Sequence, residues 1–183
     1  MPWIIDYALV LDVMRGQGFV ARYYNGGAFD FPAPIQASEI RWTADDPGET
    51  AGRVAAAWRT ASPGPVWLLP MSHWQHAFEQ AGGNWLAAVI ESTGVDAGQL
   101  SQRVSAAAIE FSDADAAFLE RVIERLLTPP HPGSYTIAFP RRPVLCEIDP
   151  LARHVWWRTA DASIAARIER VGVLSVGDSG PGA

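Results

Sequence analysis

Residues 135–159, YTIAFPRRPVLCEIDPLARHVWWRT, decide the fold class of this chain. The stretch holds three apolar runs, at 135–139, 144–148 and 154–159. A turn at Pro140-Arg-Arg-Pro143 separates the first two runs, and Asp149-Pro150 opens the short connection to the third. Connections of this length join antiparallel strands, because a parallel crossover needs a dozen or more residues. The stretch therefore predicts an antiparallel meander of three strands.

The segments on either side of the meander extend it into an α+β pattern. Residues 105–111 are typical of a strand, and Ser112 is a capping residue with two acids in the following turn. The helix that follows has one apolar stripe, made of Phe118, Leu119, Val122, Ile123, Leu126 and Leu127. Asp161 is placed to cap a last helix over 162–170. The order β-α-β-β-β-α over about 105–171 predicts an antiparallel sheet with helices packed mainly on one face.

The first half of the chain is less regular. Residues 4–14 fit either a buried strand or a helix, and the spacing of their apolar residues favours the helix. Residues 19–24 and 28–31 are predicted to form a hairpin around Asn25-Gly26. Residues 71–78 fit a helix and a strand equally well. The remaining predicted elements are strands at 40–43 and 66–69 and helices at 47–61, 85–92 and 96–103.

The length and the positions of proline and glycine predict the domain organisation. A chain of 183 residues is long enough for one well-packed core. We expect a single α+β domain over residues 1–176, with any internal seam at residues 62–65, where the sequence is Ser-Pro-Gly-Pro. Residues 177–183 are rich in glycine and are predicted to be a flexible tail.

Charge and cysteine content exclude several classes of partner. The chain has 14 Lys+Arg, all of them arginine, against 20 Asp+Glu, a net charge of −6. Because no basic cluster is present, we expect no nucleic-acid partner. The apolar N-terminal stretch is too short to cross a bilayer and contains Asp6 and Asp12, so no membrane association is expected. The single Cys146 excludes an internal disulfide and predicts a buried thiol in a cytoplasmic protein.

One spacing indicates a metal site. His73, His76 and Glu79 follow one another at intervals of three residues. On a helix, neighbouring members of this series lie close enough to share a metal ion. In a strand, His73 and His76 would point to opposite faces and the site would not form. No other motif indicates a metal or an organic cofactor, and we expect none.

The eight tryptophans and one arginine pair are the candidate binding residues. Trp156 and Trp157 are adjacent in a predicted strand, so one indole must point away from the core. Trp74 lies beside the two histidines. Arg141 and Arg142 occupy a turn between two prolines, where two guanidinium groups could grip a carboxylate or phosphate. Most other tryptophans are expected in the core, and Glu110 and Glu147 are expected on solvated strand faces.

The sequence contains no motif that identifies a family. The absence of a catalytic constellation favours a non-catalytic cytoplasmic protein that acts through protein–protein contacts. A bacterial immunity-type or accessory factor, blocking a basic partner through acidic and aromatic contacts, is one concrete version. The first alternative is a small-molecule-binding or metal-dependent enzyme domain with a pocket lined by Trp, His and Arg. The second is a structural subunit of a phage or secretion assembly, and the oligomeric state stays open.

Overall fold

The computed structural model describes residues 1–81, 84–129 and 133–174. The predicted tail at 177–183 lies outside the described residues. The strands are β1 (Trp3–Ile5), β2 (Val20–Ala21), β3 (Phe29–Asp30), β4 (Ser38–Thr43), β5 (Val66–Pro70), β6 (Ala108–Phe111), β7 (Tyr135–Ala138), β8 (Val144–Asp149) and β9 (His154–Thr159). The helices are α1 (Tyr7–Gly16), α2 (Pro47–Ala61), α3 (Trp74–Gln80), α4 (Asn84–Glu91), α5 (Gly98–Ser101), α6 (Ala116–Leu127) and α7 (Ala162–Leu174), with a 3₁₀ turn at Asp113–Asp115.

Seven of the described strands form one antiparallel sheet in the order β1-β6-β5-β7-β8-β9-β4. The meander predicted from residues 135–159 is its β7-β8-β9 portion. Strands from the two halves of the chain pair at both ends of the sheet, β1 with β6 and β4 with β9. The sheet therefore continues across the predicted seam at residues 62–65.

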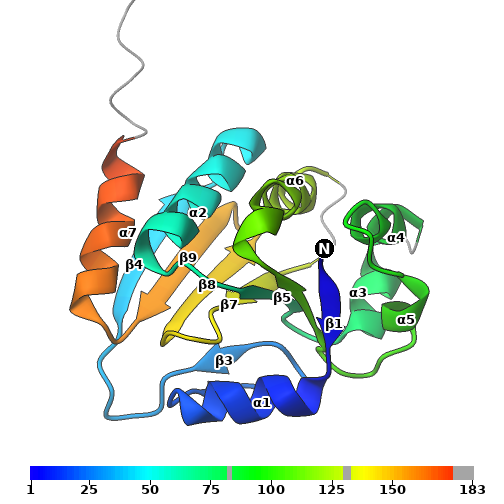
Figure 1. The fold of residues 1–183 in the computed structure, drawn as a ribbon, viewed down its shortest axis with the longest axis horizontal. Coiled ribbons are helices and arrows are strands. Elements are labelled where there is room, and N and C mark those ends of the chain that lie inside the picture. Colours follow the sequence, from blue (N-terminus) through cyan, green and yellow to red (C-terminus); the bar gives the residue numbers. More distant parts are fainter. Residues whose placement is uncertain (82–83, 130–132, 175–183) are drawn as a thin grey trace, which may run out of the picture.

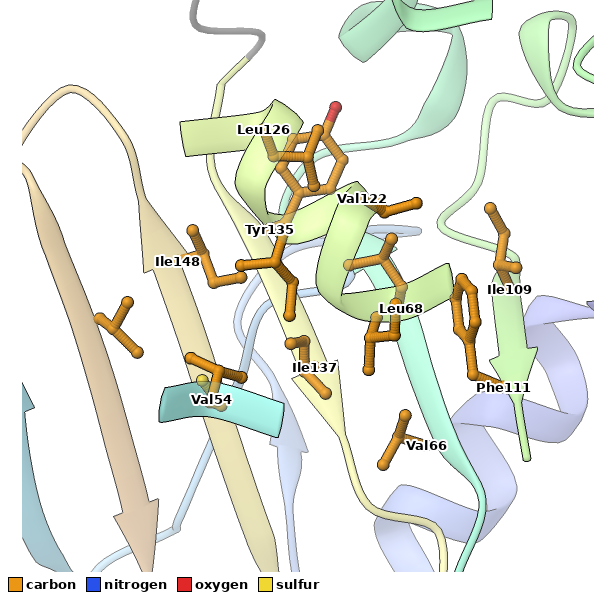
Figure 2. Close-up of a cluster of buried hydrophobic side chains, with 14 of the residues drawn as sticks. Val54, Val66, Leu68, Ile109, Phe111, Val122, Leu126, Tyr135, Ile137 and Ile148 are labelled. Carbon is orange, nitrogen blue, oxygen red and sulfur yellow. The ribbon is translucent and has the colours of Figure 1, made fainter. Parts of the chain in front are cut away.

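Helices cover one face of this sheet, which we call the helix-covered face. Figure 1 shows α2, α6 and α7 side by side above the strands, with α3, α4 and α5 grouped beyond β1. Figure 2 shows how apolar side chains from β5, β6, β7 and β8 point toward α6 and α2. Leu68, Phe111 and Ile123 in this layer are fully buried. The predicted α+β class, with helices mainly on one side, is confirmed.

The helix boundaries follow capping signals in the sequence. The Asp46 carboxylate accepts a hydrogen bond from the backbone N–H of Glu49 at 2.7 Å, and Pro47 occupies the first position of α2. Ser112 and Asp115 form a reciprocal capping box before α6. Asp161 accepts hydrogen bonds from the N–H groups of Ser163 and Ile164 at the start of α7. Helices α2 and α7 begin where the sequence predicts, whereas the predicted first turn after Ser112 is a 3₁₀ turn and α6 begins at Ala116.

The second face of the sheet is covered only in part. Helix α1 and the β2-β3 hairpin lie across it, opposite α2 and α6 (Figure 1). Val10 and Met14 of α1 pack with Trp67 and Leu69 of β5 in a second apolar cluster. This cluster ends at Leu145 of β8, and the strands beyond it are covered by charged side chains instead.

Two stretches differ from the sequence prediction in detail. The apolar spacing of residues 4–14 favours a helix over a strand, but the structure forms both: β1 ends at Ile5, and α1 begins at Tyr7. The β1 residues pair with β6, a partner more than a hundred residues away that no local pattern reveals. The predicted strand at 19–24 is shorter, because only Val20 and Ala21 pair with β3.

Candidate functional site

A buried ion network joins the β2-β3 hairpin to the second face of the sheet. Arg158 of β9 donates hydrogen bonds to Glu147 of β8, to Asp30 at 2.6 Å and to the carbonyl oxygen of Phe29 at 2.7 Å. Arg22 adds a contact with Glu147 at 3.1 Å and with Asp30 at 3.5 Å. Arg158 and Glu147 are 4% and 5% exposed. On this part of the second face, the ion network therefore replaces the apolar packing found elsewhere on the sheet.

Glu147 is the buried carboxylate of this network. Burial raises the pKa of Glu147 above its ordinary value, and the positive charges of Arg158 and Arg22 oppose that shift. A buried carboxylate needs such partners, because an unpaired buried charge is costly. The expectation that Glu147 lies on a solvated face is therefore wrong. Its sequence neighbours gave no sign of the two arginines, which lie 11 and 125 residues away.

Strand register arranges the polar side chains beyond this network in two rows. Glu147 of β8 is opposite Trp156 of β9, and Trp156 is opposite Arg41 of β4. In the next row, Asp149 is opposite His154, and His154 is opposite Thr43. The Arg41 guanidinium lies 4.7 Å from the centre of the Trp156 ring, in a cation–π contact.

These rows line a concave site of about 280 Å³, which we call the charged hollow. Its lining includes Arg22, Arg41, Met71, Glu147, Asp149, His154 and Trp156. The carboxylates of the hollow are therefore on β8, and its arginines are on β4 and in the β2-β3 hairpin. The Trp156 indole and the His154 imidazole of β9 lie between β8 and β4. Such a surface can hold a charged or bipolar group.

A second concave site, of about 560 Å³, adjoins the first at Met71. We call it the tyrosine-rimmed hollow, and its main lining residues are Tyr23, Tyr24, Met71, His73, His76 and Leu151. Three of these side chains are well exposed: Tyr23 at 59%, Tyr24 at 94% and Leu151 at 74%. The site is an open depression with an apolar edge.

Tight backbone packing holds the hairpin loop beside this hollow. The Gly27 N–H lies within hydrogen-bond distance of the carbonyl oxygens of Pro70 and Ser72, at 3.2 and 3.3 Å. A Cβ atom on Gly26 would lie 2.8 Å from the carbonyl oxygen of Met71, so only glycine fits there. The Tyr7 hydroxyl donates to the Gly26 carbonyl at 2.9 Å. The two exposed tyrosines therefore project from a fixed loop.

The predicted tryptophans separate into core and surface residues. Trp74 is fully buried, and its indole N–H donates to the carbonyl oxygen of Ala107 at 2.5 Å. Trp157 is 1% exposed and packs against Trp42 and Phe139 on the helix-covered face. Trp156 is the outward indole of the pair, half-buried in the charged hollow. Of the three, only Trp156 lines one of the two hollows.

Arg141 and Arg142 lie apart from both hollows. They form the turn between β7 and β8, at the opposite end of β7 from Tyr135 and Met71. Both side chains are exposed, and Arg141 lies against Gly64. The structure therefore does not bring this arginine pair together with Trp74, Trp156 or the histidines.

The predicted metal ligands are on one short helix but are not assembled as a group. His73 is the N-cap of α3, and its Nδ1 accepts a hydrogen bond from the backbone N–H of His76 at 3.2 Å. The Glu79 carboxylate accepts instead from Gln75 at 3.2 Å. Across the described residues there is no group of three or more His, Cys, Asp or Glu side chains that could hold a metal ion. The centres of the His73 and His76 rings are 5.8 Å apart. Both rings form part of the wall of the tyrosine-rimmed hollow.

Cys146 has no catalytic environment. It is fully buried on the helix-covered face of β8, and burial raises the pKa of its thiol well above the usual range, with the Glu147 charge adding to the shift. A nucleophilic cysteine needs the opposite, a lowered pKa. This thiol is a core side chain, as the sequence predicts.

Sequence reasoning missed the residues that shape the two hollows. Tyr23 and Tyr24 were expected in a strand, and Met71 and Leu151 carried no signal as site residues. The only available signal is the pair of adjacent tyrosines directly before the Asn25-Gly26 turn, because turns and loops lie at the surface of a domain. Arg41 had no distinguishing pattern.

Comparison with known proteins adds no assignment: no protein-family model, curated protein or solved structure matches this chain. Within the described ranges, no helix has both the length and the apolar character needed to span a membrane.

Proposed function

We propose that this protein is a cytoplasmic binding protein that contacts a partner protein through the tyrosine-rimmed hollow. The observation that carries the proposal is the gathering of Tyr23, Tyr24 and Leu151 at the edge of one depression while each remains largely exposed. Exposed large apolar groups cost solubility and contribute nothing to the core, so their clustering indicates an interaction surface.

The chemistry of the hollow suits an apolar or aromatic side chain of the partner. Tyrosine is enriched at interfaces because its ring gives a large contact area while its hydroxyl stays hydrated. Met71 supplies an adaptable apolar wall between the two hollows. Because the loop that carries the tyrosines is already fixed by Gly26 and Gly27, binding would order few groups.

The net charge of −6 supports a basic partner. Long-range attraction between an acidic protein and a basic one speeds encounter, whereas contacts in the hollow would set the lifetime of the complex. An immunity-type or accessory factor is the concrete version of this proposal. The first alternative, a small-molecule-binding or metal-dependent enzyme domain with a pocket lined by Trp, His and Arg, would have to use other residues than Trp74, Trp157, Arg141 and Arg142, because the two indoles are in the core and the arginine turn lies elsewhere.

Photo-crosslinking in the native cell tests the proposal. A photoreactive phenylalanine analogue is placed at Tyr24 or at Leu151, and at Val173 of α7 as a control of similar exposure, 71%. We expect Tyr24 and Leu151 to give an adduct with the same protein and Val173 to give none. The purified partner should then bind the Tyr23→Ala/Tyr24→Ala variant at least tenfold more weakly than the wild type.

Two results would overturn the proposal. The first is the absence of any adduct from both hollow positions. The second is an adduct that forms equally from Val173, because the contact would then not belong to the tyrosine-rimmed hollow. A circular dichroism spectrum and melting temperature equal to those of the wild type must accompany the double variant, and both are expected, since neither tyrosine is part of the core.

A further inference from the structure

We propose that the charged hollow binds a small zwitterion of the α-amino-acid type, with its carboxylate at Arg41 and its ammonium group at Asp149. This site is independent of the partner surface proposed above, because it rests on other residues and shares only Met71 with the tyrosine-rimmed hollow.

Two charged side chains of the hollow remain without an ion-pair partner among the described residues. Glu147 is already engaged by Arg158 and Arg22, so it contributes little free charge to the hollow. Asp149 accepts one hydrogen bond, from the backbone N–H of Ala152 at 3.0 Å, and has no ion pair within the described part of the chain. Arg41 likewise has no carboxylate partner among the described residues and lies over the Trp156 ring. One anion and one cation are therefore left to act on a ligand.

Asp149 and Arg41 lie on either side of one strand. Asp149 is on β8 and Arg41 is on β4, with β9 between them. Two inter-strand steps separate β8 from β4 by about 10 Å along the sheet, and the Arg41 guanidinium leans back over β9 to within 4.7 Å of the Trp156 ring centre. Both charged groups therefore line one hollow, together with His154 and the edge of the strand that carries Trp156. The Arg41 guanidinium lies over the Trp156 ring, which holds this cation within the hollow.

A singly charged ligand fits the hollow poorly. A simple anion attracted by Arg41 would also face the unpaired carboxylate of Asp149 in the same hollow. A simple cation attracted by Asp149 would face the unpaired guanidinium of Arg41. Each pays a like-charge cost that a ligand with both charges avoids. The volume of about 280 Å³ lies just below the range of about 300–1,000 Å³ typical of pockets for drug-sized molecules, which favours a small ligand.

The test uses the purified protein labelled with ¹⁵N and follows the indole N–H signal of Trp156, assigned with a Trp156→Phe variant. The twenty standard amino acids are titrated one by one. We expect at least one to shift the Trp156 signal in a saturable way at millimolar concentration. Its N-acetyl derivative, which lacks the ammonium group, and its carboxamide, which lacks the carboxylate, should each bind at least tenfold more weakly.

Charge-removing variants then assign the two ends of the ligand. In Arg41→Met, the free amino acid and its carboxamide should bind equally, because the carboxylate no longer has a partner. In Asp149→Asn, the free amino acid and its N-acetyl derivative should bind equally for the same reason. Arg59→Met and Asp12→Asn, two exposed positions outside the hollow, are the matched controls and should retain full discrimination.

The proposal is overturned if no amino acid shifts the Trp156 signal, or if the blocked derivatives bind as well as the free amino acid to the wild type. It is also overturned if Arg41→Met and Asp149→Asn keep wild-type discrimination. Failure here leaves the crosslinks from Tyr24 and Leu151 unaffected, so the two proposals are tested separately.

Discussion

The two faces of strand β8 show the main contrast in this molecule. Val144, Cys146 and Ile148 point toward the helices and are fully buried in apolar packing. The alternate residues Glu147 and Asp149 point to the second face, where an ion network and an open hollow replace the helix layer. The same six residues thus contribute to a closed core and to a candidate site. Strand alternation determines which face of the sheet each side chain is on. The segments that cover that face then determine whether the side chain is in an apolar core or in a polar site.

Adjacent tryptophans on β9 repeat the contrast. Trp157 packs between Trp42 and Phe139 and stabilises the fold, whereas Trp156 is in contact with Arg41 and is half-buried. These two adjacent tryptophans have different roles because the helix layer covers Trp157 and not Trp156.

The largest expected effect comes from Trp157→Ala. Removing this fully buried indole leaves a cavity on the helix-covered face, which should lower the free energy of unfolding by about 4 kcal/mol. Trp156→Ala should lower it by less than half as much, because its indole is partly exposed to solvent. Guanidinium denaturation followed by circular dichroism compares the two variants. Equal losses would show that the two faces do not differ as described.

Arg158→Met should have the next largest effect. The variant leaves Glu147 buried with Arg22 as its remaining arginine contact, at a cost of about 3 kcal/mol. A second variant, Arg158→Met/Glu147→Leu, should recover part of this loss because the buried carboxylate is gone. Urea denaturation measures both, with the exposed Arg142→Met as the control that should change stability by less than about 0.5 kcal/mol. A double variant less stable than Arg158→Met would contradict the conclusion that Glu147 is a buried carboxylate that depends on Arg158.

Asp115→Asn should have the smallest effect, and the effect should depend on pH. Burial would raise the pKa of Asp115, but hydrogen bonds from Ser112 and the nearby Met1 amino group lower it below its ordinary value of 3.8. The ionised carboxylate therefore stabilises the fold above that ordinary value, by about 1 kcal/mol as a helix cap. This contribution is lost as the pH falls through the lowered pKa.

Denaturation of the wild type and of Asp115→Asn between pH 2 and pH 7 checks this prediction. The difference between them should be greatest near neutral pH and should shrink in acid. Asp12→Asn, at an exposed position of α1, is expected to show no such dependence. A difference that grows toward low pH would mean that the sign of the Asp115 pKa shift is wrong.

Most elements of the helix layer and the meander could be predicted, because their signals are local. The apolar stripe of α6, the caps at Asp46, Ser112 and Asp161, and the short connections of β7-β8-β9 each depend on residues a few positions apart. The stretch at 71–78 was undecided because helical and strand spacing both fitted. Trp74 resolves it by hydrogen bonding to Ala107, a distant residue that only the folded chain supplies.

The candidate site could be predicted only in small part. The sequence pointed to Trp156 through its neighbour Trp157, and to His73 and His76 through their spacing. Arg141 and Arg142 looked equally suitable but lie at the other end of the β7-β8 hairpin. The hollows themselves depend on the loop at Gly26 lying against Met71, a contact that spans 45 residues and has no counterpart in local pattern.

By itself, the sequence determined the α+β class, the order of its C-terminal elements and the fact that one indole of the 156–157 pair points outward. These features follow from capping chemistry, from the alternation of strands and from turn lengths, which act over a few residues. Only the tertiary structure decided which indole it is, that Glu147 is buried between arginines, and that Tyr23, Tyr24 and Leu151 share one hollow. Those outcomes depend on which segments cover each face of the sheet, and that choice is made by contacts between residues far apart in the chain.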